Sequence, residues 1–309
     1  MDLHEPIVCV VGPTASGKTE LAQRIALAID GEVVSADSMQ VYKGMDIGTG
    51  KITPDEQIVL HHCLDIVEPG EPYSAALFQI EARRCFEDIS KRGKRAVLCG
   101  GTGFYVRAAI DDYEFPEGEQ VGNAVRDHYM AIARERGASE LWELLRESDA
   151  NSAAIIPPND VKRVVRAFEL LEAGTSYADQ KEKLAKIPQR YPALFIGLSV
   201  DPAVLRTRID VRVDSMVASG LVDEVRGLLA AGLREGITSP QAIGYKEIVE
   251  YLDGLCALDD AIDRIKLATH RYAKRQRTWF RKDKRITWLD ATEYNLDDLL
   301  AQSLALIGK

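Results

Sequence analysis

Residues 7–19 read Ile-Val-Cys-Val-Val-Gly-Pro-Thr-Ala-Ser-Gly-Lys-Thr, and the prediction of the fold starts from them. Its first part, Ile7 to Val11, is a short apolar run of the kind that forms a buried parallel strand. Its second part matches the phosphate-loop pattern G-x-x-x-x-G-K-S/T at every position. Helical periodicity follows from about Lys18 to Ile29. A strand, such a loop and a helix in this order predict a site for a diphosphate or a triphosphate.

The phosphate loop would hold its ligand through both backbone and side-chain groups. Free N–H groups and the positive end of the helix dipole converge on phosphate oxygens at the start of the helix. Lys18 would neutralise phosphate charge, and the Thr19 hydroxyl would hold Mg²⁺. The predicted diphosphate ligands are Gly12, Pro13, Thr14, Ala15, Ser16, Gly17, Lys18 and Thr19. The competing interpretation is a chance glycine-rich turn, which the flanking strand and helix disfavour.

Alternating strand and helix patterns continue along the chain. Strands are predicted over residues 7–11, 32–36, 96–99 and 193–200. Helical patterns separate them, and we expect the first helix to end at Gly31 and a second, Ala75 to Lys91, to stop at Gly93. After the last of these strands we expect helices almost to the end of the chain. The order predicts an α/β fold with a doubly wound parallel sheet.

An acidic, Pro- and Gly-containing segment from Asp111 to Glu119 interrupts this alternation and predicts a domain boundary. Residues 120 to 187 then show helical periodicity only, as in Val125–Arg136, Ser139–Arg146 and Asp160–Leu171. We therefore expect an α/β core over residues 1–117 and 190–309, with C-terminal helices. Residues 118–189 are expected to form an inserted all-helical domain.

Composition is that of an ordinary soluble protein, with 309 residues, 46% hydrophobic and 28% charged. The N-terminal residues lack the pattern of a signal peptide, and no apolar run is long enough to span a membrane. The five cysteines form no Cys-x-x-Cys pair, which favours reduced thiols in a cytoplasmic protein over disulfides or zinc.

The charge distribution contains one strongly basic segment. The net charge is −9, yet Arg264 to Arg285 holds ten Lys or Arg and one acid, Asp283. A solvated helix face is the ordinary explanation of such a run. The alternative is a helix that follows the phosphates of a nucleic acid.

Asp37 follows the second predicted strand, where ligands of open α/β sheets lie. It would serve there as a general base or as an outer Mg²⁺ partner. Alternatively it is a turn or cap aspartate, because Ser-Ala-Asp-Ser is good capping chemistry. Its position alone leaves both open.

The third strand is followed by Gly100-Gly101-Thr102-Gly103, with no acid at its tip. The missing acid counts against a motor-type ATPase. The glycines allow either close approach of the backbone to a ligand or a plain tight turn.

Several motifs occur together in a fixed order. They are the phosphate loop, Ser35 to Thr49, His61-His62 with Asp65, Gly100 to Tyr105, Arg208-Ile209 with Arg212-Val213-Asp214 and Met216, Gln241 to Glu247, and Lys274 to Arg281. Together they resemble the tRNA dimethylallyltransferase (tRNA isopentenyltransferase) family, of the bacterial type. One departure is Gly48-Thr49-Gly50-Lys51-Ile52, where the family usually reads Gly-Thr-Ala-Lys-Pro.

This resemblance implies a function and its residues. The phosphate loop would bind dimethylallyl diphosphate, and the helical insertion would close over the tRNA anticodon stem-loop. Asp37 would take a proton from the exocyclic amine of the adenine 3′-adjacent to the anticodon. The residues matching family positions that meet tRNA are Asp37, Ser38, Met39, Gln40, Thr102, Arg126, Lys162, Arg163, Val164, Val165 and Arg166. We add Gln241, Tyr245, Lys246, Lys274, Arg275 and Arg277 as RNA contacts. We expect a monomer.

Other assignments remain open at this level. Arg212, and with it Arg208, is a candidate for the same phosphates, although a helix-surface ion pair is the commoner role for such arginines. Trp279 continues an apolar stripe, so we predict a core role over base stacking. We assign His61 and His62 no catalytic role. The alternative functions are an ATP-dependent small-molecule kinase and an RNA chaperone without chemistry.

Overall fold

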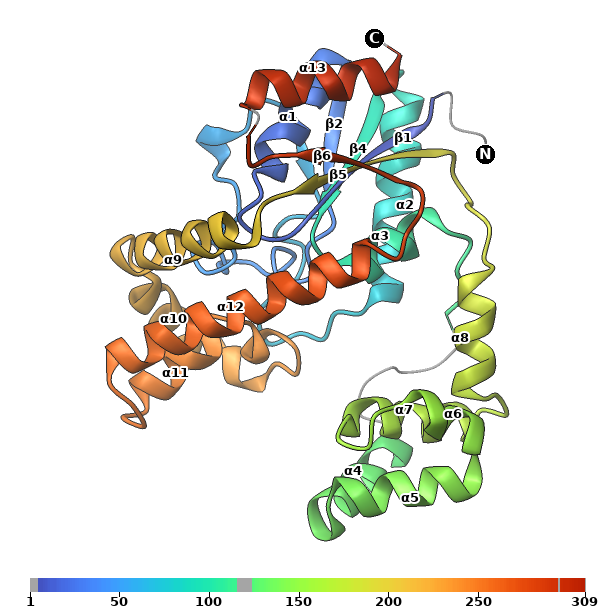
Figure 1. The fold of residues 1–309 in the computed structure, drawn as a ribbon. Helices are drawn as coiled ribbons and strands as arrows, with labels where there is room; N and C mark the ends of the chain where they lie inside the picture. Colours follow the sequence, from blue (N-terminus) through green and yellow to red (C-terminus); the bar gives the residue numbers. More distant parts are fainter. Residues whose placement is uncertain (1–4, 116–123, 294, 309) are drawn as a thin grey trace. The chain divides into compact units, whose positions relative to one another are not determined.

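The computed structural model describes residues 5–115, 124–293 and 295–308, which fold into two units (Figure 1). The α/β unit comprises Met1–Asp111 and Gln189–Lys309, and the helical unit comprises Asp112–Pro188. The predicted boundary between residues 117 and 118 lies outside the described residues. No described helix is both long enough and apolar enough to cross a membrane.

A six-stranded parallel sheet forms the centre of the α/β unit, in the order β3-β2-β4-β1-β5-β6. Every neighbouring pair is parallel. The strands are β1 (Ile7–Val11), β2 (Gly31–Ser35), β3 (His61–His62), β4 (Arg95–Gly100), β5 (Ala193–Ser199) and β6 (Ile286–Asp290). The predicted α/β fold is confirmed, and parallel strands of this kind require crossover connections.

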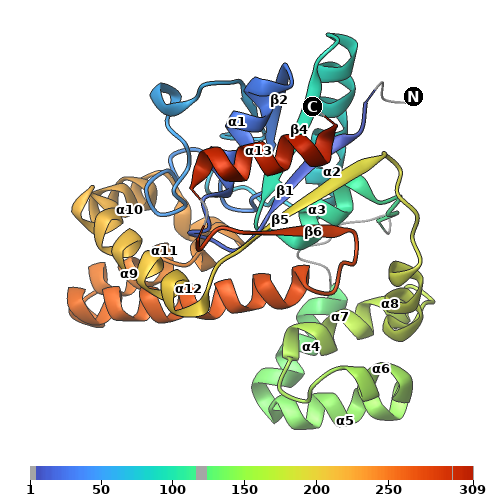
Figure 2. The same cartoon turned by 45° about the horizontal axis from the view of Figure 1, so that its top comes forward.

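Side chains of β1 alternate between two apolar cores, one on each face of the sheet. Val8 and Val10 belong to the core that includes α1 (Lys18–Ala28) and α13 (Leu296–Ile307). Ile7, Cys9 and Val11 belong to the core that includes α2 (Ala75–Lys91) and α3 (Gly103–Ile110). Figures 1 and 2 show these helix pairs on opposite sides of the sheet. Burial on both faces explains why β1 is a continuous apolar run.

A group of C-terminal helices extends the α1 side of the core. It consists of α9 (Pro202–Ala218), α10 (Leu221–Ala230), α11 (Tyr245–Leu252) and α12 (Leu258–Phe280). Two short 3₁₀ turns, η2 (Leu233–Glu235) and η3 (Ser239–Gln241), connect α10 to α11, and a third, η1 (Pro54–Glu56), lies between β2 and β3. Ile209, Leu221 and Ile265 join the same buried cluster as Val8 and Val10. The expectation of helices almost to the end is wrong, because β6 intervenes. Only Ile286 and Leu289 of β6 are buried, as befits an edge strand, so no continuous apolar run marks it.

The predicted helix end at Gly31 is also wrong. Helix α1 ends at Ala28, and the left-handed residue after it is Asp30, with φ of 51°. Gly31 is instead the first residue of β2, where an added Cβ would lie 2.6 Å from the Arg95 carbonyl oxygen. The second prediction is confirmed, since α2 ends at Lys91 and Gly93 has φ of 75°.

The helical unit contains α4 (Ala124–Arg136), α5 (Ala138–Ser148), α6 (Ala150–Ile155), α7 (Val161–Glu172) and α8 (Tyr177–Ala185). Its core contains Leu141, Leu145 and Phe168, and Tyr129 stacks on Phe168 with ring centroids 3.8 Å apart. Its described residues, 112–115 and 124–188, include no strand. Helix α8 lies inside the range that we predicted to be helical, although its bounds were not predicted because its sequence is polar.

Candidate functional site

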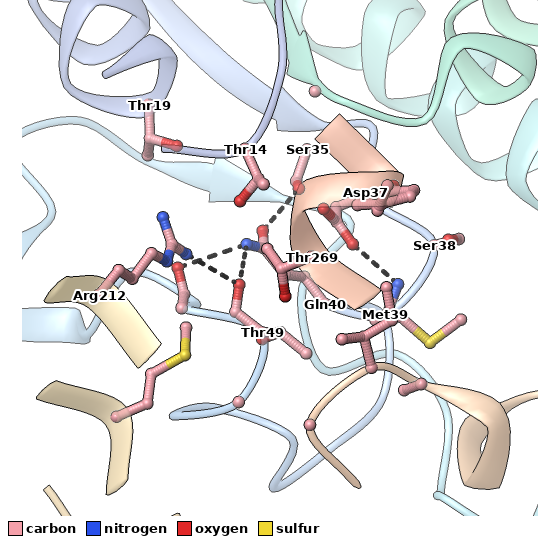
Figure 3. A pocket seen from close by; sticks show the side chains of 18 of the residues that line it. Thr14, Thr19, Ser35, Asp37, Ser38, Met39, Gln40, Thr49, Arg212 and Thr269 are labelled. Atoms are coloured by element: carbon pink, nitrogen blue, oxygen red, sulfur yellow. Dashed lines mark hydrogen bonds between the residues drawn. The ribbon is translucent and has the colours of Figure 1, made fainter. Parts of the chain in front are cut away.

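A cavity of about 310 Å³ opens in the α/β unit at the carboxyl ends of the strands. Its lining includes Thr14, Lys18 and Thr19 after β1, together with Ser35 and Asp37 at the end of β2. Arg212 of α9 and Thr269 of α12 also line it (Figure 3). This is where open α/β sheets bind ligands.

The phosphate loop has the backbone that an anion site requires. Gly17 precedes α1 with φ of 85°, a left-handed conformation that glycine adopts without strain. Lys18 Nζ donates to the Pro13 carbonyl oxygen at 3.2 Å, which holds its ammonium against the loop. The buried Ser16 hydroxyl has no hydrogen-bond partner among the described residues. A phosphate oxygen would satisfy that group.

One loop amide is already occupied. The Thr14 N–H donates to Gln276 Oε1 of α12 at 2.9 Å, and Gln276 Nε2 donates to the Gly101 carbonyl oxygen at 3.0 Å. Gln276 is only 5% exposed, so these hydrogen bonds are shielded from water. Thr14 therefore offers a ligand its hydroxyl, and its amide instead attaches α12 to the loop.

Lys18 and Arg212 place two cations beside the same cavity. Desolvation lowers the pKa of Lys18, and the nearby Arg212 charge lowers it further while Asp37 opposes the shift. Desolvation likewise lowers the pKa of Arg212, again opposed by Asp37. Two desolvated cations that repel each other are stabilised by an anion between them. Arg208 has another role, because it donates to the Ala291 carbonyl oxygen at 3.2 Å and does not line the cavity.

Asp37 makes a turn contact and also lines the cavity, so its geometry is compatible with both of the roles that its position left open. Its Oδ1 accepts a hydrogen bond from the Met39 N–H at 2.9 Å, which is the turn contact (Figure 3). The carboxylate also lines the cavity, and no described group donates a hydrogen bond to Oδ2. Next to it, the Ser38 N–H donates to Thr102 Oγ1 at 3.2 Å. One oxygen fixes the side chain while the other can accept a proton.

Gln40 ties the cavity wall to the loop that follows it. Its Oε1 accepts from Ser35 Oγ at 3.0 Å, and its Nε2 donates to the Thr49 carbonyl oxygen at 3.5 Å. Arg212 Nη2 donates to the same carbonyl oxygen at 3.3 Å, so one backbone group orients both side chains (Figure 3).

Gly50 explains the departure from the usual family pattern. It has φ of 58°, and an added Cβ would lie 1.8 Å from Arg212 Nη2. The absence of a side chain at Gly50 thus gives the Arg212 guanidinium its place beside Thr49.

Tyr245 stabilises the loop around Ile47 and Gly48 through Glu224, which corrects its assignment as an RNA contact. Its side chain is fully buried, and its hydroxyl donates to Glu224 Oε1 at 2.6 Å. Glu224 in turn accepts from the N–H groups of Ile47 at 2.6 Å and Gly48 at 3.1 Å. A buried side chain with a satisfied hydroxyl cannot contact RNA.

The glycines at the end of β4 and after it make room for other parts of the protein, which is a third explanation beside the two left open. Added Cβ atoms at Gly101 and Gly103 would lie 2.2 Å from Gln276 Nε2 and 2.1 Å from the Trp279 indole. At Gly100 the neighbour would be the Ala36 carbonyl oxygen at 2.2 Å. The loop is therefore shaped by contact with α12 and with the residue after β2, and its Thr102 accepts a hydrogen bond from the Ser38 N–H.

The basic segment is divided by its ion pairs. Toward its ends, Arg264 pairs with Glu250, Lys266 pairs with Asp214 at 2.7 Å, and Arg285 pairs with Asp111 at 2.5 Å. Between them lie exposed cations with no ion pair to any described residue: Arg271, Lys274, Arg275, Arg281, Lys282 and Lys284. The partly buried Arg277 likewise has no described ion pair, and Arg275 lies over the Tyr272 ring at 5.6 Å. These unpaired cations suit a polyanion.

Predicted RNA contacts on the helical unit differ in availability. Arg126 pairs with Glu169 at 2.7 Å, Arg166 pairs with the same glutamate at 3.1 Å, and Arg163 pairs with Asp160 at 2.7 Å. Lys162 is exposed. The side chains of Val164 and Val165 lie in the core of this unit, which corrects their assignment as side-chain contacts. On the α/β unit, Gln241 and Lys246 are exposed.

Several cavity residues had no role in our sequence-based assignment, and three of them are polar side chains with a clear place in the site. His61 lines the cavity, and burial lowers its pKa to about 4, so its ring is neutral at pH 7. Tyr272 lines it too, and burial raises its pKa to about 12. Gln276 also lines the cavity, and its position in the motif Lys274 to Arg281 was the only sign in the sequence of a role for it.

The donor set is compatible with Mg²⁺ bound together with a diphosphate. Thr19 contributes to the cavity lining a hydroxyl oxygen, which is a ligand of the kind that Mg²⁺ takes. Among the described residues, no group of three or more His, Cys, Asp or Glu side chains could hold a metal by itself. Phosphate oxygens would therefore complete the coordination.

Comparisons with known proteins agree with one another. A family model described as IPP transferase matches residues 40–283, and one described as isopentenyl transferase matches residues 5–61. The tRNA dimethylallyltransferase of Carboxydothermus hydrogenoformans is 45% identical over 310 residues, covering 99% of this chain and 98% of that protein.

Solved structures are similar as well. The full-length tRNA isopentenylpyrophosphate transferase of Bacillus halodurans has a TM-score of 0.72 and 42% identity, covering 98% of this chain and 96% of that one. A eukaryotic dimethylallyltransferase described as acting on tRNA has a TM-score of 0.80 and 29% identity, covering 98% and 78%.

Proposed function

The chain belongs to the IPP transferase family, and we propose that it transfers a dimethylallyl group from dimethylallyl diphosphate to tRNA. The acceptor is the exocyclic amine of the adenine 3′-adjacent to the anticodon, as the motif resemblance implied. The observation that carries this proposal is one cavity lined by Lys18, Arg212 and Asp37. It supplies two cations for a leaving diphosphate and a carboxylate for a departing proton.

The reaction exchanges bonds at one allylic carbon. A bond forms between the amine nitrogen and that carbon, while the carbon–oxygen bond breaks and its electron pair leaves with the diphosphate. An adenine amine is a weak nucleophile because its lone pair is delocalised into the ring. The allylic carbon compensates, since its positive charge spreads over the allyl system as the leaving group departs.

Charge on the leaving diphosphate is stabilised by groups that are already in position. The amides of the phosphate loop other than that of Thr14, the Ser16 hydroxyl, Lys18 and Arg212 would contact its oxygens. Removing a single preorganised donor of this kind costs roughly a hundredfold to a thousandfold in rate. Mg²⁺, held by Thr19 and the diphosphate, would add Lewis-acid stabilisation of the same charge.

Asp37 would accept the amine proton as the new bond forms. The Met39 N–H occupies Oδ1, which leaves Oδ2 for the proton. General bases of this kind contribute about a hundredfold to ten-thousandfold in rate.

RNA contacts would come from both units. On the α/β unit we propose Ser38, Met39, Gln40, Thr102, Gln241, Lys246, Lys274, Arg275 and Arg277. On the helical unit we propose Arg126, Lys162, Arg163 and Arg166. Single-stranded RNA is held by such combinations of cations and polar groups.

The comparisons give no support to a small-molecule kinase. Incubation with radiolabelled dimethylallyl diphosphate and tRNA tests the proposal directly. Label recovered in the RNA supports it. ATP turnover without prenyl transfer would favour the kinase, and RNA binding without either reaction would favour the chaperone. We further propose that the protein acts as a cytoplasmic monomer.

A further inference from the structure

Trp279 is not a core residue, which overturns the prediction made from its helical spacing. It is 43% exposed on α12, whereas the neighbouring Phe280 is 3% exposed. The buried stripe of α12 passes through Ile265, Ala273 and Gln276 and leaves Trp279 beside it. A large indole that remains half-exposed while its helix is firmly packed needs another explanation.

The indole is held in a defined place. The Cδ1 and Nε1 atoms of the indole lie against Gly103, where an added Cβ would be 2.1 Å from each of them. One helical turn earlier, Gln276 fixes α12 to Thr14 and Gly101 through two hydrogen bonds, of which the one to Gly101 is buried. The ring is therefore preorganised by backbone contacts on α3 and by the attachment of its own helix. Binding through such a ring loses little conformational entropy.

Trp279 also continues the cavity lining outward along α12. Tyr272, Arg275 and Gln276 line the cavity, and Trp279 lies one turn beyond the last two of them. Arg275 covers the Tyr272 ring at 5.6 Å, so rings and a cation alternate along this side of the helix. Lys274 on α12 and Arg281 directly after this helix are close to Trp279 in the sequence. Both are exposed, and neither has a described ion pair.

We propose that Trp279 stacks on an unpaired nucleobase that neighbours the reacting base in the RNA loop. The inference rests on the proposed function, because that function brings a single-stranded RNA loop to this cavity. Aromatic side chains hold splayed bases by stacking, and the surrounding cations hold the backbone. A base stacked at this point would keep the next base directed into the cavity. Trp279 is thus a positioning residue for the acceptor and takes no part in the bond changes.

The test compares Trp279→Ala, Trp279→Phe and Leu267→Ala. Leu267 is a matched control, because it is 49% exposed on the same helix and does not line the cavity. We measure the dissociation constant of a labelled anticodon stem-loop by filter binding, without dimethylallyl diphosphate, and then steady-state transfer. Trp279→Ala should weaken RNA binding by about tenfold or more, and Trp279→Phe should retain most of the affinity. The KM for dimethylallyl diphosphate should not change.

Abasic nucleotides identify the stacked base. Substituting each loop base in turn should reveal one position where loss of the base weakens wild-type binding and has no further effect on Trp279→Ala. Equal effects of Trp279→Ala and Leu267→Ala would overturn the inference. So would an abasic scan with no such position, or a raised KM for dimethylallyl diphosphate that indicates a merely structural role. Absence of transfer by the wild type, with RNA binding intact, would instead count against the proposed function.

Discussion

Replacing Asp37 with Asn separates the two roles that the structure gives to this carboxylate. The amide oxygen of Asn can still accept the Met39 N–H now held at 2.9 Å, so the turn persists. The amide cannot accept the amine proton. The expected loss is a hundredfold to ten-thousandfold in the chemical step, or about 3 to 5 kcal/mol of transition-state stabilisation.

The affinity of Asp37→Asn for dimethylallyl diphosphate should not fall together with its rate. Asp37 is a negative group near Lys18 and Arg212, and it raises the pKa of both. Without the Asp37 charge, the positive charges of Lys18 and Arg212 are less neutralised by the protein. The affinity for dimethylallyl diphosphate should therefore be unchanged or higher. Loss of rate with retained binding is the pattern expected of a base.

Asp37→Ala provides the matched comparison. It removes the proton acceptor and the turn contact together, so it should add about 1 kcal/mol of instability to the same catalytic defect. Single-turnover transfer with both substrates saturating measures the chemical step, and thermal unfolding measures stability. The reasoning is refuted if Asp37→Asn transfers the prenyl group within about threefold of the wild-type rate while Asp37→Ala only melts earlier.

Three further predictions follow from the charges. Lys18→Ala should lower transfer by at least a hundredfold, and a loss below about threefold would remove it from the diphosphate site. Lys274→Glu should lower the log–log salt slope of tRNA affinity by roughly one unit, whereas Arg226→Glu, a control on α10, should not change it. The Arg92 guanidinium lowers the pKa of buried Glu32 to about 2, so this pair stabilises the fold above pH of about 4.5 and loses that effect as pH falls toward 2. Glu32→Gln should therefore cost about 3 kcal/mol of unfolding free energy at pH 7, with the difference from wild type narrowing at about pH 3 in urea titrations.

Local features of this chain were predictable because neighbouring residues determine them. The apolar run of β1, the phosphate loop and the start of α1 lie within residues 7–28, and each depends on burial or backbone conformation over a few positions. Helix α2 was predicted at both ends, since its apolar face repeats with the helical period and Gly93 ends it. The parallel sheet followed from the alternation of such elements.

Edge elements gave weaker patterns. Strand β6 buries few side chains, so it lacks the periodicity from which a strand is predicted. Helix α8 is polar, so its bounds could not be predicted within the helical region. The order of the strands, with β4 between β2 and β1, likewise depends on pairing between distant segments.

The details of the site depend on tertiary structure alone. Gln276 accepts a hydrogen bond from the Thr14 amide, 262 positions away in the sequence. The need for glycine at position 50 arises only because Arg212 of α9 packs against it. Val164 and Trp279 both lie on amphipathic helices, yet the first is buried and the second is exposed. Helical spacing shows which residues share a face, but burial depends on what packs against that face. That partner comes from another part of the chain, and so the exposed tryptophan and the attachment of α12 to the phosphate loop emerged only from the folded molecule.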